Sequence, residues 1–118
     1  MKPIKVYQYA NCSTCKKALR FLQNQKVEFV AVDIVTAPPS RAELEKMAKH
    51  LGDFRKLFNT SGQVYRELKL SEKMPGLDLS DAIELLAANG KLIKRPFVWL
   101  GDQGMVGFKE AEWKEALQ

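Results

Sequence analysis

The stretch IKVYQYANCSTCKKALRFL, residues 4–22, carries the strongest structural signal in this chain of 118 residues. Residues 4–9 have the composition of a β-strand and residues 16–22 that of a helix, so the segment between them is a strand-to-helix junction. Cys12 and Cys15 lie in this junction and form a Cys-x-x-Cys pair. Such a pair after a first strand is typical of thiol redox chemistry. We therefore predict a redox site at the end of the first strand.

Cys12 is expected to be the nucleophile of this pair. The first turn of a helix has unpaired backbone N–H groups and the positive end of the helix dipole, so a thiolate is stabilised there relative to a thiol. Lys16, Lys17 and Arg20 follow closely, and positive charge nearby also favours the reactive thiolate.

Cys15 is expected to be the resolving thiol. It lies three residues after Cys12, about one helical turn, so its sulfur can reach that of Cys12 and close a short disulfide. We expect Cys15 to be the more buried of the two. Ser13 and Thr14 are predicted to cap the helix, because their hydroxyl groups can accept hydrogen bonds from its first N–H groups.

Three other interpretations of the cysteines are possible. A structural zinc site needs four ligands, but the chain has two cysteines and one histidine, His50, so zinc would require a dimer. A permanent structural disulfide would close a loop of only two residues and would constrain the unfolded chain very little. Two inert core cysteines remain the plainest alternative, since buried free cysteine is common. The redox interpretation is favoured, and no metal is expected.

Composition limits the class of protein. A chain of 118 residues with 46% hydrophobic residues suits one domain spanning residues 1–118. Nothing at the N-terminus resembles a signal peptide, and no apolar stretch is long enough to span a membrane. We therefore expect a soluble, cytoplasmic protein with no membrane contact. Cytoplasmic thiols are kept reduced, which favours a catalytic or sensing pair over a permanent disulfide.

The net charge of +5 does not by itself indicate a nucleic-acid partner. The 19 basic residues are scattered among 14 acidic ones, and no nucleic-acid motif accompanies them. We therefore expect no direct nucleic-acid binding.

The order of predicted elements indicates an α/β fold. Residues 27–34 form a second strand, which should be parallel to the first because a helix connects them. Residues 38–90 then read as a helical insertion. Residues 94–100 and 105–108 are predicted strands joined by a hairpin turn at 101–104, and residues 109–117 are predicted to form the last helix. The order βαβ, helices, ββα predicts a mixed four-stranded sheet.

Local signals mark the ends of the inserted helices. Ser40 and Glu43 have the spacing of a capping box, and Gly52 fits a helix end. Ser80 is predicted to cap a helix over residues 81–89, with Gly90 in the left-handed conformation after it.

These elements resemble the thioredoxin fold: a Cys-x-x-Cys pair after the first strand, an X-Pro before the third, and a closing ββα unit. More narrowly, the helical insertion and three further segments resemble the arsenate reductase (ArsC) family, with the Spx/MgsR-like branch closest. These segments are Asn59-Thr60-Ser61-Gly62 with Tyr65-Arg66-Glu67-Leu68, Lys94-Arg95-Pro96, and Gly107-Phe108-Lys109-Glu110.

The resemblance implies roles for particular residues. Cys12 matches the family's catalytic cysteine, and Cys15 matches the second cysteine of Spx-like members. Arg95 matches an arginine that binds the oxyanion in the reductases and lies beside the redox pair in Spx. Pro96 is expected to follow a cis peptide bond. The neighbouring residues Asn11, Ser13, Thr14 and Asn59 are expected to shape the site.

The resemblance also implies a departure from arsenate chemistry. The reductases carry two further arginines, at the positions that Asn59 and Phe108 occupy here. Charge-assisted hydrogen bonds contribute about 1.5–3 kcal/mol each, so the loss of two should weaken oxyanion binding about a hundredfold or more. We therefore expect arsenate to be a poor substrate.

Two functions follow from the resemblance. The first is a thiol–disulfide oxidoreductase of the arsenate reductase family, with no bound cofactor, whose thiols are restored by thioredoxin, glutaredoxin or glutathione. The second is a redox-sensing transcriptional regulator like Spx, which binds the C-terminal domain of the RNA polymerase α subunit. Gly52 lies near the glycine that contributes to this docking in Spx.

Overall fold

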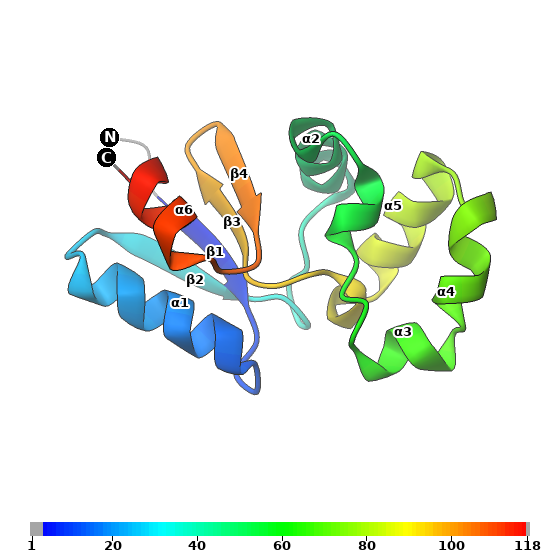
Figure 1. Cartoon of the computed structure of the whole chain (residues 1–118), viewed down its shortest axis with the longest axis horizontal. Helices are drawn as coiled ribbons and strands as arrows, with labels where there is room; N and C mark the ends of the chain where they lie inside the picture. Colours follow the sequence, from blue (N-terminus) through cyan, green and yellow to red (C-terminus); the bar gives the residue numbers. More distant parts are fainter. Residues whose placement is uncertain (1–3, 118) are drawn as a thin grey trace.

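A mixed four-stranded sheet forms one part of the molecule in a computed structural model, which describes residues 4–117 (Figure 1). β1 is parallel to β2 and antiparallel to β3, and β3 is antiparallel to β4, in the order β2-β1-β3-β4. This arrangement confirms the predicted α/β fold and the parallel pairing of the first two strands. The strands are β1 (Ile4–Gln8), β2 (Phe29–Asp33), β3 (Phe97–Leu100) and β4 (Gln103–Val106).

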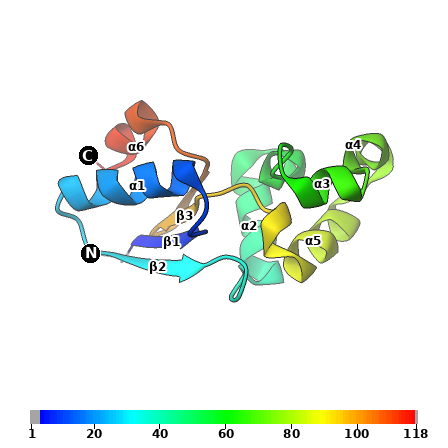
Figure 2. The ribbon, with the colours of Figure 1, turned by 90° about the horizontal axis from the view of Figure 1, so that it is seen from below.

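Helices connect and cover these strands. α1 (Ser13–Asn24) joins β1 to β2, and α6 (Glu110–Ala116) follows β4. The helices of the predicted insertion lie between β2 and β3 and are grouped beside the sheet, away from α1 and α6, in both views (Figures 1 and 2). They are α2 (Arg41–Leu51), α3 (Gln63–Glu67), α4 (Leu70–Lys73) and α5 (Leu79–Ala88), with the 3₁₀ helices η1 (Phe54–Leu57), η2 (Met74–Gly76) and η3 (Gly90–Leu92).

The two faces of the sheet bury different clusters, because successive side chains of a strand point to opposite faces. Val6 and Val98 pack on one face against α1 and α6, in a cluster that includes Trp113. Tyr7 and Phe97 belong to the larger cluster on the other face, which is filled mainly by the inserted helices. α1 and α6 thus pack on one face of the sheet, and the insertion, beside the sheet, packs against side chains of the other face.

Glu43 of α2 connects the insertion to the sheet. Its carboxylate accepts hydrogen bonds from the Tyr7 hydroxyl at 2.9 Å and from Trp99 Nε1 at 3.1 Å. It also completes the predicted capping box, since the Ser40 side chain accepts from Glu43 N–H and Glu43 accepts from Ser40 N–H. A Cβ at Gly104 of β4 would overlap the flexible end of the Met47 side chain and the Trp99 ring, so a larger residue there would displace these side chains.

Two predicted helix caps were wrong. Cys12, and not Ser13 or Thr14, is the N-cap of α1, and its sulfur accepts the backbone N–H of Cys15. Asp78, and not Ser80, is the N-cap of α5, because the helix begins at Leu79 and the Asp78 carboxylate accepts from Asp81 N–H. In each case a residue nearer the preceding loop supplies the acceptor.

The predicted turn conformations also needed correction. Gly90 is buried but does not have a positive φ, and a side chain there would overlap the carbonyl oxygen of Ile34. The glycine is needed for space and not for left-handed backbone. The hairpin turn is shorter than predicted, since Leu100 pairs with Gln103 and only Gly101 and Asp102 lie between the strands. Gly52, in contrast, has a φ of 83° at the end of α2, as predicted.

Candidate redox site

Cys12 lies where the loop after β1 enters α1. Its Sγ accepts the backbone N–H of Cys15 at 3.2 Å, and its own N–H donates to the carbonyl oxygen of Tyr9 at 3.0 Å. The side chain is half-buried and lines a cavity. This sulfur is thus accessible and lies at the positive end of a helix, where negative charge is favoured.

Cys15 lies behind Cys12 in the first turn of α1 and is completely buried. Burial, together with hydrogen bonding to Cys12 and the charge of that neighbour, raises the pKa of the Cys15 thiol to about 12, although Arg95 and a backbone hydrogen bond from Tyr9 act in the opposite direction. Cys15 is therefore a neutral thiol at neutral pH. Both cysteines are free in the structure.

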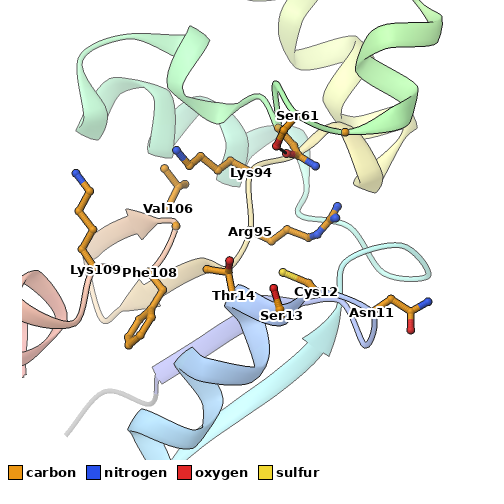
Figure 3. Close-up of a pocket in the computed structure, with 13 residues that line it drawn as sticks. Asn11, Cys12, Ser13, Thr14, Ser61, Lys94, Arg95, Val106, Phe108 and Lys109 are labelled. Atoms are coloured by element: carbon orange, nitrogen blue, oxygen red, sulfur yellow. Dashed lines mark hydrogen bonds between the residues drawn. The ribbon is translucent and has the colours of Figure 1, made fainter.

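The cavity in front of Cys12 has a volume of about 500 Å³ and is formed by segments far apart in the sequence (Figure 3). The end of β1 and the start of α1 form one wall, the loop before α3 a second, and the segments flanking β3 and β4 the rest. The lining residues are Asn11, Cys12, Ser13, Thr14, Asn59, Ser61, Gly62, Lys94, Arg95, Val106, Gly107, Phe108 and Lys109.

The structure brings most of the predicted site residues to this cavity. Ser13 and Thr14 lie beside Cys12 at the start of α1, whereas Asn11 is exposed and its side chain points away from Cys12 (Figure 3). Cys15 and Pro96 are buried and do not line the cavity. The Arg95–Pro96 peptide bond is cis, as expected.

Arg95 is held against an aromatic ring. Its guanidinium carbon lies 5.1 Å from the centroid of the Tyr9 ring, and Nη1 donates to the carbonyl oxygen of Lys91 at 3.3 Å. Its Nε is buried and has no hydrogen-bond partner among the residues that the structure describes. Arg95 thus lines the same cavity as Cys12, with its guanidinium held against the Tyr9 ring.

Comparison with known proteins assigns the family. The model of the ArsC family matches residues 7–116, nearly the whole chain. This protein belongs to the ArsC family. YusI of Bacillus subtilis is 43% identical over 110 residues, which cover 92% of this chain and 93% of YusI. The global transcriptional regulator Spx of Streptococcus pyogenes serotype M3 is 31% identical over 108 residues, covering 91% of this chain and 79% of that protein.

A solved structure supports the same assignment. The crystal structure of an ArsC family related protein from Bacteroides fragilis superposes with a TM-score of 0.92 at 42% sequence identity, and the match covers 98% of each chain. The similarity extends over the sheet and the inserted helices together. The fold is therefore that of the thioredoxin-like ArsC proteins.

Phe108 and Asn59 occupy the two positions at which the resemblance implies arginines in the arsenate reductases. The Phe108 ring lies 5.0 Å from the Trp113 ring and 5.6 Å from the Phe21 ring, measured between centroids, so this half-buried ring packs against the core beside α1 and α6 while it lines the cavity. Asn59 accepts a hydrogen bond from the Ser61 hydroxyl at 3.3 Å through Oδ1. Arg95 is accordingly the one arginine lining the cavity within the described part of the chain.

Sequence reasoning missed several residues around the ArsC-family site. Lys94 and Lys109 also line the cavity, and both belong to motifs that carried the family resemblance without being given a role. Tyr9 and Lys91 lie beside Arg95, and no sequence pattern indicated this. Among residues 4–117, no three His, Cys, Asp or Glu side chains are grouped as a metal site would require. No helix in the same range is long and apolar enough to cross a membrane.

Proposed function

We propose that this protein is a thiol–disulfide oxidoreductase in which Cys12 attacks the substrate and Cys15 resolves the intermediate. The observation that carries the proposal is the arrangement of the pair. Cys12 is a half-buried helix N-cap on a cavity, and its sulfur accepts a hydrogen bond from the backbone of the completely buried Cys15. The Cys12 sulfur can therefore react with a substrate in the cavity. The Cys15 sulfur lies within one helical turn, where it can attack the resulting mixed disulfide.

The reaction has two exchange steps. The Cys12 thiolate attacks one sulfur of a substrate disulfide, which forms a mixed disulfide and releases the other half of the substrate as a thiolate that takes up a proton. Cys15 then loses its proton and attacks the Cys12 sulfur, which forms the Cys12–Cys15 disulfide and releases the second half as a thiol. The substrate gains two electrons, and the protein loses them.

The Cys15 environment suits this order of events. A neutral, buried thiol does not compete with Cys12 for the incoming disulfide, because the thiolate is the attacking species. An external dithiol must then reduce the Cys12–Cys15 disulfide. Thioredoxin, or glutaredoxin with glutathione, is the proposed reductant, and a cytoplasmic location would supply either one.

Arsenate is proposed to be a poor substrate. Arg95 offers a guanidinium to the cavity, but neither Phe108 nor Asn59, which also line it, carries a charge. Two charge-assisted contacts of about 1.5–3 kcal/mol each are therefore absent. The affinity for a tetrahedral oxyanion should be about a hundredfold or more below that of a reductase with all three arginines.

The proposal is tested by turnover of a small disulfide and of arsenate, side by side, with thioredoxin and glutaredoxin systems as reductants. Wild-type protein should reduce the disulfide, and its kcat/KM for arsenate should lie about a hundredfold or more below that of an arsenate reductase with all three arginines measured in the same assay. Cys12→Ser should abolish turnover of both. Activity retained by Cys12→Ser would refute the mechanism.

Trapping distinguishes the two cysteines. Cys15→Ser should accumulate a mixed disulfide at Cys12, visible as a mass increase in intact-protein mass spectrometry. Cys15→Ala is the matched control for placing a hydroxyl in a buried position, and it should trap the same adduct. If neither variant accumulates the adduct while wild type turns over, Cys15 is not the resolving thiol.

A redox-responsive regulator is the second candidate, and the similarity to Spx favours it. In that case the Cys12–Cys15 pair would be a sensor, and the partner would be the C-terminal domain of the RNA polymerase α subunit. The test is a pull-down with that isolated domain, using the reduced and the oxidised protein. Absence of binding in both redox states would remove this candidate.

A further inference from the structure

A second, smaller cavity lies on the other side of Arg95 from the redox site. Its volume is about 240 Å³, and it shares Arg95, Asn59 and Gly62 with the cavity in front of Cys12. Its remaining lining residues are Tyr9, Gln63, Val64 and Lys91. A molecule bound at Cys12 could therefore extend past Arg95 into this space.

Two cations share one aromatic ring in this smaller cavity. The Lys91 Nζ atom lies 5.8 Å from the Tyr9 ring centroid, and the Arg95 guanidinium carbon lies 5.1 Å from the same centroid. Cation–π attraction holds each of them near the ring, and both residues line the same small cavity. An anion in this cavity would be attracted by both charges.

No described residue neutralises either cation. Among residues 4–117, no carboxylate forms an ion pair with Lys91 or Arg95, and neither cavity has an Asp or Glu in its lining. Lys109 at the larger cavity, in contrast, pairs with Glu112 at 3.9 Å. The positive charges of Lys91 and Arg95 are thus available to attract an anion bound in the two cavities.

Arg95 also keeps donor groups unused. Its Nη1 donates to the Lys91 carbonyl oxygen at 3.3 Å, and this is the one hydrogen bond of the guanidinium within the described residues. The buried Nε is not accessible from the cavity, so the outer N–H groups are the ones that a bound anion can use. The planar guanidinium suits a carboxylate, which can accept two of its N–H groups at once.

We propose that the smaller cavity is a subsite for a carboxylate of the substrate, so that the preferred substrate is a disulfide carrying a negative charge near the reacting sulfur. This inference rests on the proposed thiol–disulfide function and adds the substrate's chemical class. Lys91 and Arg95 bind the carboxylate, with the Tyr9 ring keeping both cations in place. The disulfide bond then lies in the larger cavity, where Cys12 attacks it.

The test uses two substrates of the same shape: dithiodipropionate and its uncharged diamide. The kcat/KM of each is divided by its rate with free dithiothreitol in the same buffer, so that intrinsic reactivity cancels. The wild-type protein should prefer the acid. Lys91→Gln should lower the ratio of acid to diamide about tenfold, which is the size of one charge-assisted contact that is partly exposed to solvent. The effect should be mainly in KM, and added salt should reduce the preference.

Lys49→Gln is the matched control, because it removes the same charge from an exposed lysine that lines neither cavity. It should leave the ratio of acid to diamide as in wild type. An equal ratio in wild type and Lys91→Gln would overturn the inference while turnover of the diamide still supports the proposed function. If neither disulfide is reduced, the proposed oxidoreductase function is refuted, and so is the proposed carboxylate-bearing substrate.

Binding without turnover gives a second readout. In the Cys12→Ser background, which cannot form the mixed disulfide, dithiodipropionate should raise the thermal midpoint and the diamide should raise it less. Adding Lys91→Gln should remove the difference. If acid and diamide shift the midpoint equally, the smaller cavity does not recognise a carboxylate.

Discussion

Replacing Glu43 tests how the helical insertion is held against the sheet. Glu43→Ala removes the acceptor for the Tyr7 hydroxyl at 2.9 Å and for Trp99 Nε1 at 3.1 Å, and it breaks the capping box with Ser40. Each donor left without a partner costs about 1–3 kcal/mol when fully buried, and half a capping box costs about 0.5–1 kcal/mol. The Glu43 side chain is 26% exposed, so water partly compensates.

We expect Glu43→Ala to lower the free energy of unfolding by about 2 kcal/mol. With a urea dependence of about 1–3 kcal/mol per molar, the unfolding midpoint should fall by about 1 M. Glu45→Ala is the control, since Glu45 lies on the same helix, is exposed and has no ion pair among residues 4–117. If the two variants lose equal stability, Glu43 does not stabilise the contact between insertion and sheet.

The contribution of Glu43 should also depend on pH. Burial opposes its ionisation, but hydrogen bonds from Ser40, Tyr7 and Trp99, together with the charge of Lys5, hold the pKa of Glu43 below its ordinary value of 4.5. A carboxyl group with a lowered pKa in the folded state stabilises the fold above its ordinary pKa, and this stability is lost as the pH falls through the folded-state pKa. Glu43→Gln should therefore be less stable than wild type at pH 7, and the difference should shrink below pH 4.5.

Two further predictions concern the two thiols and Gly90, which packs against the backbone of Ile34 after β2. At pH 7, iodoacetamide should label Cys12 and leave Cys15 unlabelled, because Cys15 is completely buried and burial raises its pKa to about 12; equal labelling in a peptide mass map would contradict this. Gly90→Ala should lower the free energy of unfolding by about 1–3 kcal/mol, since a methyl group there overlaps the Ile34 carbonyl. Gly76→Ala, where the new methyl group meets nothing within 4 Å, is the control in the same urea titration.

The parts of the fold predicted correctly rest on local patterns. The first strand, α1 and the second strand follow from residues 4–34, and their parallel pairing follows from the helix that connects them. The Ser40 and Glu43 capping box was also predictable, because both partners lie within four residues of each other. Such features depend on neighbours along the chain.

The predictions that failed required knowledge of competing neighbours. Ser80 is a good capping residue, but Asp78 lies two residues earlier, and its carboxylate accepts the N–H of Asp81 in the first turn of α5. Gly90 follows a helix as an αL glycine would, yet it is required because Ile34 of a distant segment passes against it. In both cases the propensity of one residue type was not enough to predict its role, because the position of a neighbouring residue in the folded protein decided it.

The sequence by itself determined the chemistry of the site. The spacing of Cys12 and Cys15 at a strand-to-helix junction predicts a redox pair, and Arg95 before Pro96 carries the family resemblance, because these features are covalently adjacent or one helical turn apart. Only the tertiary structure decided what surrounds the pair. Tyr9 and Lys91 meet at Arg95 because the sheet order places β1 beside β3, and the chain entering β3 passes the end of β1. Contacts between side chains so far apart in the chain exist only after folding, and the proposed substrate preference depends on them.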